Sequence, residues 1–153
     1  MRIEEHVVIA ADAARVWSLI ADPPALAALD DGVLIEADDP GAAPGLRSRY
    51  RAMLRVGPVP AGGDVEIVEY VPQRDLAWTS LTGIDQRFRL RVRSEDDGRT
   101  RLTVRFGYSS PGALGWVADL VAFGQVREIM RSLLAGVRKE AEKRPRRRAR
   151  APR

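Results

Sequence analysis

The stretch that decides the fold is residues 84–108, IDQRFRLRVRSEDDGRTRLTVRFGY. In its first half, uncharged side chains at even positions alternate with mostly arginine at odd positions. The second half continues the alternation, with apolar even positions at Leu102, Val104 and Phe106. Because successive side chains of a strand point to opposite faces, the pattern predicts two antiparallel strands with one buried and one solvated face. Between them, the sequence Asp-Asp-Gly at 96–98 predicts a hairpin turn.

The same period of two extends toward the N-terminus. Residues 46–56 alternate between arginines at most odd positions and uncharged side chains at even ones. Four further stretches also read as strands: residues 2–10, 32–37, 64–71 and 75–82. The sequence therefore predicts an antiparallel sheet of about seven strands.

Two short helices are predicted directly after the first strand. Asp12 is typical of a helix N-cap, because its carboxylate accepts hydrogen bonds from the exposed N–H groups of the first turn. Apolar side chains follow at helical spacing up to Ile20. The proline pair at 23–24 ends this helix and favours a second short helix over about 24–29.

The final element is one long helix, predicted from about residue 112 to 143. Ser110 and Pro111 are typical of an N-cap followed by a proline in the first turn. An apolar stripe at helical spacing follows at Val126, Ile129, Met130, Leu133 and Val137. Residues 144–153 carry no such periodicity. We therefore expect one domain over 1–143 and a basic, disordered tail over 144–153.

The net charge of +4 is unevenly distributed. Residues 138–153 contain nine Lys or Arg against two Glu, whereas the preceding 137 residues contain sixteen basic and nineteen acidic side chains. The folded part is thus mildly acidic, and the tail has no aromatic residues to stack on bases. We expect no nucleic-acid partner. The tail is either a solvated extension or a weak contact for an anionic membrane or protein partner.

The absence of certain residue types further limits the metal sites and catalytic mechanisms that the chain can support. The chain has no Cys and a single His, His6. This composition excludes disulfides, Cys-based metal sites and sites built from two or three imidazoles, so no metal or cofactor is expected. No nucleophile-elbow or phosphate-loop motif occurs. The charged opening residues and the absence of a membrane-length apolar stretch predict a soluble, cytoplasmic protein.

Three stretches and the C-terminal helix carry a family resemblance. The stretches are VVIAADAARVWSLIADP at 7–23, VEIVEYVPQRDLAW at 65–78 and GRTRLTVRFGY at 98–108. Together they resemble the START-like, or SRPBCC, superfamily, close to its polyketide cyclase/dehydrase group, over residues 1 to about 142. The resemblance implies an α+β helix-grip fold, in which a curved antiparallel sheet of about seven strands wraps the long C-terminal helix, with two short helices after the first strand. It also implies an apolar cavity between sheet and helix, where members bind lipids, sterols, polyketides, plant hormones or quinones.

Several side chains are candidates to line such a cavity. If the even-numbered strand faces point inward, they place polar or amphipathic groups inside, which need hydrogen-bond partners there. The candidates for ligand binding are Ser48, Tyr50, Trp78, Ser80, Gln86, Phe88, Phe106, Tyr108 and Met130. The alternative for each polar group is a place at the rim or a bond to the backbone, and for Trp78 a role in core packing.

Acid–base chemistry would require an ionisable group inside the cavity. The weak candidates are Glu69, Tyr50 and Tyr108. Glu69 shares its parity with Ile67, and a carboxylate in an apolar cavity would have a raised pKa. The opposite parity of that strand is almost as apolar, however, so a surface position for Glu69 is the alternative. His6 has Glu4 and Val8 as parity neighbours and is expected on the outside.

Three functions follow from these observations. The leading hypothesis is a protein that binds a small hydrophobic ligand of lipid, polyketide or quinone type between sheet and terminal helix. The first alternative is a polyketide aromatase/cyclase that uses a cavity carboxylate or Tyr in acid–base catalysis. The second is a lipid- or protein-interaction module whose basic tail supplies electrostatic attraction. The sequence predicts neither the ligand nor the oligomeric state.

Overall fold

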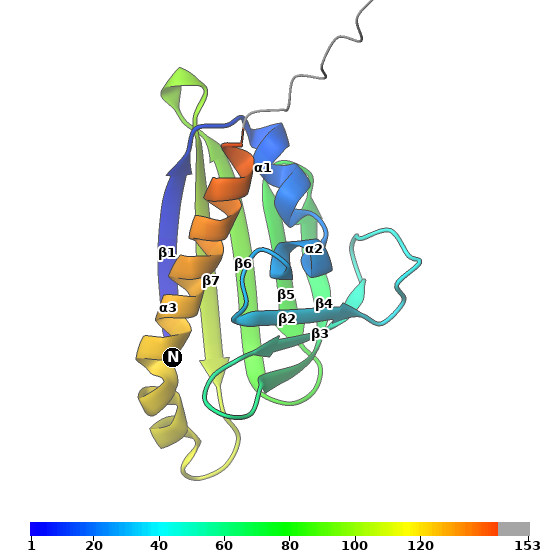
Figure 1. The fold of residues 1–153 in the computed structure, drawn as a ribbon. Coiled ribbons are helices and arrows are strands. Elements are labelled where there is room, and N and C mark those ends of the chain that lie inside the picture. Colours follow the sequence, from blue (N-terminus) through cyan, green and yellow to red (C-terminus); the bar gives the residue numbers. More distant parts are fainter. Residues whose placement is uncertain (144–153) are drawn as a thin grey trace, which may run out of the picture.

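The computed structural model describes residues 1–143 and shows an α+β fold, a seven-stranded antiparallel sheet curled around one long helix (Figure 1). The helices are α1 (Ala13–Ile20), α2 (Pro23–Ala27) and α3 (Gly115–Ala141). The strands are β1 (Arg2–Ile9), β2 (Val33–Ala37), β3 (Arg49–Leu54), β4 (Ala61–Val71), β5 (Asp75–Ser80), β6 (Asp85–Ser94) and β7 (Thr100–Ser109). The predicted helix-grip fold is confirmed.

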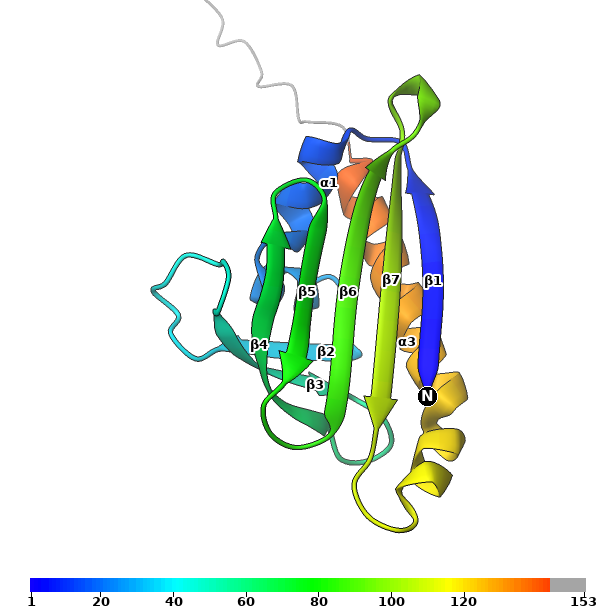
Figure 2. The same cartoon turned by 180° about the vertical axis from the view of Figure 1, so that it is seen from behind.

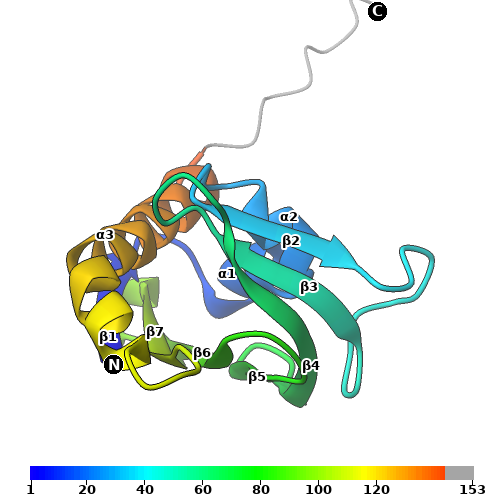
Figure 3. The ribbon, with the colours of Figure 1, turned by 90° about the horizontal axis from the view of Figure 1, so that it is seen from below.

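The sheet has the order β1-β7-β6-β5-β4-β3-β2, so only the β1–β7 pair joins strands that are distant in the sequence. Seen from behind, the outer face of the sheet is not covered by any helix of the described residues (Figure 2). Seen from below, the sheet curls so that β2 and β3 come round toward the side of α3 (Figure 3). The core therefore lies between the inner face of the sheet and α3.

The β6–β7 hairpin forms as its alternation predicts. Phe88 pairs with Phe106, and Leu90 pairs with Val104, all of them buried on the inner face. The connection at 96–98 is tight because Asp97 and Gly98 adopt left-handed φ angles of 67° and 71°. Burial of one face and hydration of the other thus fix this hairpin's register.

The two short helices close one end of the space between sheet and α3. The Arg15 N–H donates to Asp12 Oδ1 at 2.8 Å, which confirms Asp12 as the cap of α1. The prolines at the start of α2 occupy its first turn, where a missing N–H is tolerated. Ile20 and Leu26 are fully buried and place both helices against the core.

The long helix begins later than predicted. Gly112 has a φ of 95°, so the chain turns after β7 instead of entering a helix. A Cβ at Gly115 would lie 2.1 Å from the Ser110 carbonyl oxygen, which shows how closely the loop folds back on the first turn. Ser110 therefore does not cap α3, which begins at Gly115 and continues without a break through Gly124.

Residues 144–153 lie outside the described residues. The predictions of a disordered basic tail, and of partner contacts through it, fall on this segment and stay predictions, as does the domain boundary at 143. Within residues 1–143 no helix is both long and apolar enough to cross a membrane.

Candidate functional site

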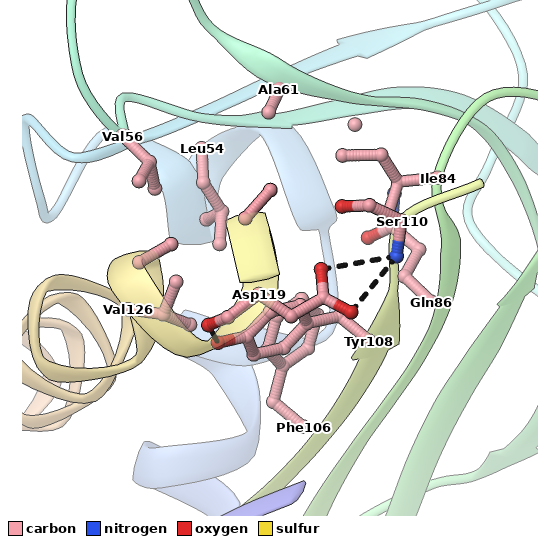
Figure 4. A pocket seen from close by; sticks show the side chains of 13 residues that line it. Leu54, Val56, Ala61, Ile84, Gln86, Phe106, Tyr108, Ser110, Asp119 and Val126 are labelled. Carbon is pink, nitrogen blue, oxygen red and sulfur yellow. Dashed lines mark hydrogen bonds between the residues drawn. The ribbon is translucent and has the colours of Figure 1, made fainter. Parts of the chain in front are cut away.

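A pocket of about 250 Å³ lies between the first turns of α3 and the ends of β3, β4, β6 and β7 (Figure 4). Its wall is mainly apolar and includes Leu54, Val56, Ile84, Phe106, Ala122 and Val126. Four residues add polar groups: Gln86, Tyr108, Ser110 and Asp119. An apolar concavity with a few converging polar groups is the usual form of a small-molecule site.

The pocket exists because the inner face of α3 is small there. Ala118 and Ala122 are the helix residues that line it, together with Asp119 and Val126. Farther along the helix, Met130 and Leu133 reach into the interior and leave a cavity of only about 20 Å³. The two spaces share Leu54, Gln86 and Phe106 as walls, so the small cavity is the inner continuation of the pocket.

Asp119 is the most distinctive group of the pocket. Asp119 is only 5% exposed, and both of its carboxylate oxygens accept from the Ser110 N–H, at 3.0 and 3.1 Å. Within residues 1–143 this N–H is the one hydrogen-bond donor to that carboxylate. Because an ionised carboxylate offers about four acceptor positions, capacity for a ligand donor remains.

Tyr108 stands next to this carboxylate. Its hydroxyl donates to the Asp119 backbone carbonyl at 2.9 Å and so joins the end of β7 to α3. Burial raises the pKa of Tyr108, and the negative charge of Asp119 raises it further. The phenol therefore stays protonated at neutral pH and remains a proton donor.

Gln86 is the register partner of Tyr108 on the neighbouring strand β6 and adds a further polar group to the pocket. Its Nε2 donates to the Ala52 carbonyl at 3.3 Å, which ties β6 to β3 across the curl of the sheet. Its backbone N–H donates to Ser80 Oγ at 3.1 Å. The amide oxygen of Gln86 receives no hydrogen bond from the described residues and is a second acceptor for a ligand.

The candidate binding residues divide into three groups. Gln86, Phe106 and Tyr108 line the pocket. Trp78, Phe88 and Met130 line the small inner cavity, where Trp78 stacks on Phe88 with ring centroids 4.1 Å apart. The remaining candidates, Ser48, Tyr50 and Ser80, line neither space.

Local bonds explain the positions of these remaining candidates. Ser48 Oγ accepts from the Gly45 N–H at 3.0 Å, and Ser80 Oγ donates to Asp85 at 3.1 Å. Tyr50 is buried away from the pocket, and that burial is the main cause of its raised pKa, with the charge of Asp22 contributing. Tyr50 therefore does not share the pocket with Tyr108, the other tyrosine considered for acid–base chemistry.

Glu69 lies on the outer face of the sheet, so it is not a cavity carboxylate. A β-bulge between Ile67 and Glu69 shifts the register of β4 against β5 and moves Glu69 opposite Ala77. Arg89 Nη2 then donates to Glu69 Oε2 at 2.6 Å. The inward position considered for Glu69 assumed unbroken alternation, which the bulge removes.

Sequence reasoning missed Asp119 as a site residue. The only signal was its position as the one charged side chain in the apolar stretch 114–126.

No group of three or more His, Asp or Glu side chains among residues 1–143 is arranged to hold a metal ion. His6 is exposed on β1, on the side away from α3.

The curled antiparallel sheet that grips a long C-terminal helix is a START-like, or helix-grip, fold, which the chain shares with a START superfamily protein of solved structure. Within that class, residues 1–142 match the family described as polyketide cyclase/dehydrase and lipid transport, and the chain belongs to this family. No curated protein matches the chain.

Solved structures share the fold at low sequence identity. A protein of Thermus thermophilus superposes with a TM-score of 0.77 at 19% identity, over 92% of this chain and 97% of its own. The Zhui aromatase/cyclase of a Streptomyces species gives a TM-score of 0.75 at 22% identity, over 93% of both chains. A START superfamily protein of Mycobacterium smegmatis gives 0.70 at 12% identity, over 91% of this chain and 98% of its own. At these identities the likeness extends to the fold alone.

Proposed function

We propose that this protein binds a small, mainly apolar ligand that carries a hydroxyl or other hydrogen-bond donor at one end. The observation that supports the proposal is the buried Asp119 carboxylate, which faces an apolar pocket with unused acceptor capacity. A donor on the ligand would meet this carboxylate, while the amide oxygen of Gln86 would accept a second hydrogen bond from the ligand.

The size of the pocket limits the ligand. About 250 Å³ lies below the roughly 300 Å³ at which pockets for drug-sized molecules begin. The inner cavity adds only about 20 Å³. A compact molecule of one or two fused rings suits this volume, whereas a sterol or a long acyl chain would require the core to open.

Binding can be tested with a matched pair of ligands, naphthol and methoxynaphthalene, in calorimetric titrations. Naphthol can donate to Asp119 and methoxynaphthalene cannot, so wild type should prefer naphthol. Asp119→Asn should reduce that preference by about tenfold, the ratio expected for one charge-assisted hydrogen bond. Equal affinity of the wild type for both ligands would remove Asp119 from the proposal.

The location of the site can be tested separately. Ala122→Leu fills the pocket wall and should weaken naphthol binding by more than about tenfold. Ala135→Leu makes the same change on an exposed face of the same helix and serves as the matched control. Retained binding in Ala122→Leu would place the ligand elsewhere.

An aromatase/cyclase activity is the second candidate, favoured by the adjacency of Tyr108 and Asp119 in one pocket. In such a reaction Asp119 would take a proton from a methylene carbon of a β-keto segment short enough to enter the pocket. The protonated Tyr108 would turn its O–H from the Asp119 backbone carbonyl and donate to the carbonyl that accepts the displaced electrons. Asp119→Asn should then reduce turnover by about a hundredfold or more while substrate binding persists. Unchanged product formation would exclude the mechanism.

A further inference from the structure

The first turns of α3 expose a large apolar surface. Figures 1 and 2 show these turns extending past the start of β1, beyond the edge of the sheet. Five apolar side chains there are exposed, with exposed fractions between 38% and 81%: Leu114, Trp116, Val117, Leu120 and Val121. Monomeric soluble proteins rarely leave such side chains clustered without a partner. We call these five residues the α3 patch.

The α3 patch lies on the opposite side of the helix from the pocket. At about 100° per residue, Val117, Leu120 and Val121 fall on one face, while Asp119 and Val126 fall on the other. The latter two are buried, and both line the pocket. The patch is therefore separate from the proposed ligand site.

Gly124 continues the α3 patch and points to what covers it. It is three, four and seven residues after Val121, Leu120 and Val117, so it shares their face. A Cβ placed on Gly124 would meet no atom of residues 1–143 within 4 Å, so packing among these residues does not require glycine there. Glycine weakens a helix interior relative to alanine. A small residue at the C-terminal end of the patch, before Arg127 and Glu128, permits the close approach of a second helix.

The charge of this face distinguishes between possible partners. Residues 110–126 contain a single charged side chain, Asp119, which is buried on the other side of the helix. Amphipathic helices that lie on membranes carry Lys or Arg beside the apolar face. The next cations on this helix, Arg127 and Arg131, both bond to Glu5 of β1, at 2.7 and 3.1 Å. The patch therefore offers no cation to a lipid headgroup, and the nearest other charge on its face is the exposed Glu128, an anion four residues beyond Gly124.

We propose that the α3 patch binds a second copy of this chain, so that two copies pack α3 against α3 with Gly124 at the crossing point. With the two helices antiparallel at Gly124, a two-fold contact places Glu128 of each copy beside the apolar Leu120 of the other, so no like charges meet. Leu120 and Trp116 are the anchors of this contact, and Gly124 sets the distance between the helices.

The mass of the full-length protein in solution tests the proposal, by sedimentation across a concentration series. Wild type is expected to be a dimer. Leu120→Arg should raise the dimer dissociation constant by about thirtyfold or more, as for an interface anchor. Leu46→Arg is the matched control, because Leu46 is 62% exposed and Leu120 58% exposed. Gly124→Met should weaken the dimer and keep the fold, since no atom of the described residues opposes a side chain there.

Cross-linking provides an independent readout. The chain contains no cysteine, so Gly124→Cys introduces a single thiol that should form a disulfide-linked dimer on mild oxidation. Leu46→Cys should not. A monomeric wild type at every concentration would overturn the proposal, as would a dimer insensitive to Leu120→Arg. Binding of a monomer to phosphatidylcholine or phosphatidylglycerol vesicles, lost in Leu120→Arg, would overturn it in favour of a bilayer.

Discussion

The two halves of α3 face the same sheet, but the second half packs closely against it and the first half leaves a pocket. In the second half, residues 126–141, large side chains fill the interior until about 20 Å³ remains. In the first half, residues 115–125, Ala118 and Ala122 face the sheet and leave a pocket of about 250 Å³. Both halves belong to one unbroken helix. The size of the inward side chains therefore decides where this fold is core and where it is a site.

The outward faces differ as well. Arg127 and Arg131 begin the charged outer face of the second half, and both are held by Glu5. The first half instead exposes the α3 patch. The division of the helix into a structural part and a binding part is thus visible on both of its sides, and substitutions in each part should have different consequences.

The largest effect is expected in the packed half. Leu133→Ala removes a side chain that is 1% exposed and enlarges the inner cavity, so it should lower the free energy of unfolding by about 2–5 kcal/mol. Urea denaturation measures this change. Ala122→Leu in the other half should change stability by less than about 1.5 kcal/mol, because its new methyl groups enter existing space. Similar losses for both variants would contradict the contrast between the halves.

Asp119 should give the next largest effect, because it is the polar link between the pocket half and β7. Asp119→Ala leaves the Ser110 N–H without its acceptor and should cost about 1–3 kcal/mol of unfolding free energy. The exposed Asp38→Ala is the control and should lie within about 0.5 kcal/mol of wild type. Equal urea midpoints for the two variants would show that the link carries no stability.

Tyr108 should link stability to alkaline pH. Because burial raises its pKa in the folded state above the unfolded value of about 10, the stability it contributes is complete below that pH. It is lost as the pH rises through the folded pKa, when ionisation favours the unfolded chain. Tyr108→Phe should flatten the decline in melting temperature above about pH 10. Tyr50 and Tyr70 have pKa values raised by burial too, so a residual slope is expected.

Glu5 should give the smallest effect, at acid pH. The hydrogen bond from Arg127 is the main cause of its lowered pKa, and the charge of Arg131 adds to it. The stability from this carboxylate is complete above its unfolded pKa of about 4.3 and is lost as the pH falls through the lower folded value. Glu5→Gln should remove less than about 1 kcal/mol at neutral pH and reduce the acid slope of the unfolding free energy. An unchanged acid slope would show that the bridge does not hold α3.

Much of the fold could be predicted because its signals are local. The alternation through Phe88, Leu90 and Val104 requires two neighbouring strands with one dry face, and left-handed residues at 97–98 allow the turn between them. The Asp12 cap is equally local, since its partner Arg15 is one turn away. The start of α3 was predicted too early because Gly112 favours a turn that Ser110 and Pro111 do not reveal.

The candidate site was harder to predict, since its members come from distant parts of the chain. Gln86 and Tyr108 were considered from strand parity, whereas parity left both faces open for Glu69, because a bulge has no signature in the alternation. Asp119 gave almost no signal. Its role depends on the Ser110 N–H, which approaches it only because the loop folds back on the helix.

The sequence by itself determined the period of each element, the caps and turns, and therefore a curved sheet with one apolar face and a helix to cover it. These depend on residues within a few positions of one another. The tertiary structure decided where α3 does not fill the space beside the sheet, because a pocket forms only where two facing surfaces fail to meet. The space beside Ala122 becomes a site only when Leu54, Gln86 and Tyr108 from three other strands stand opposite it.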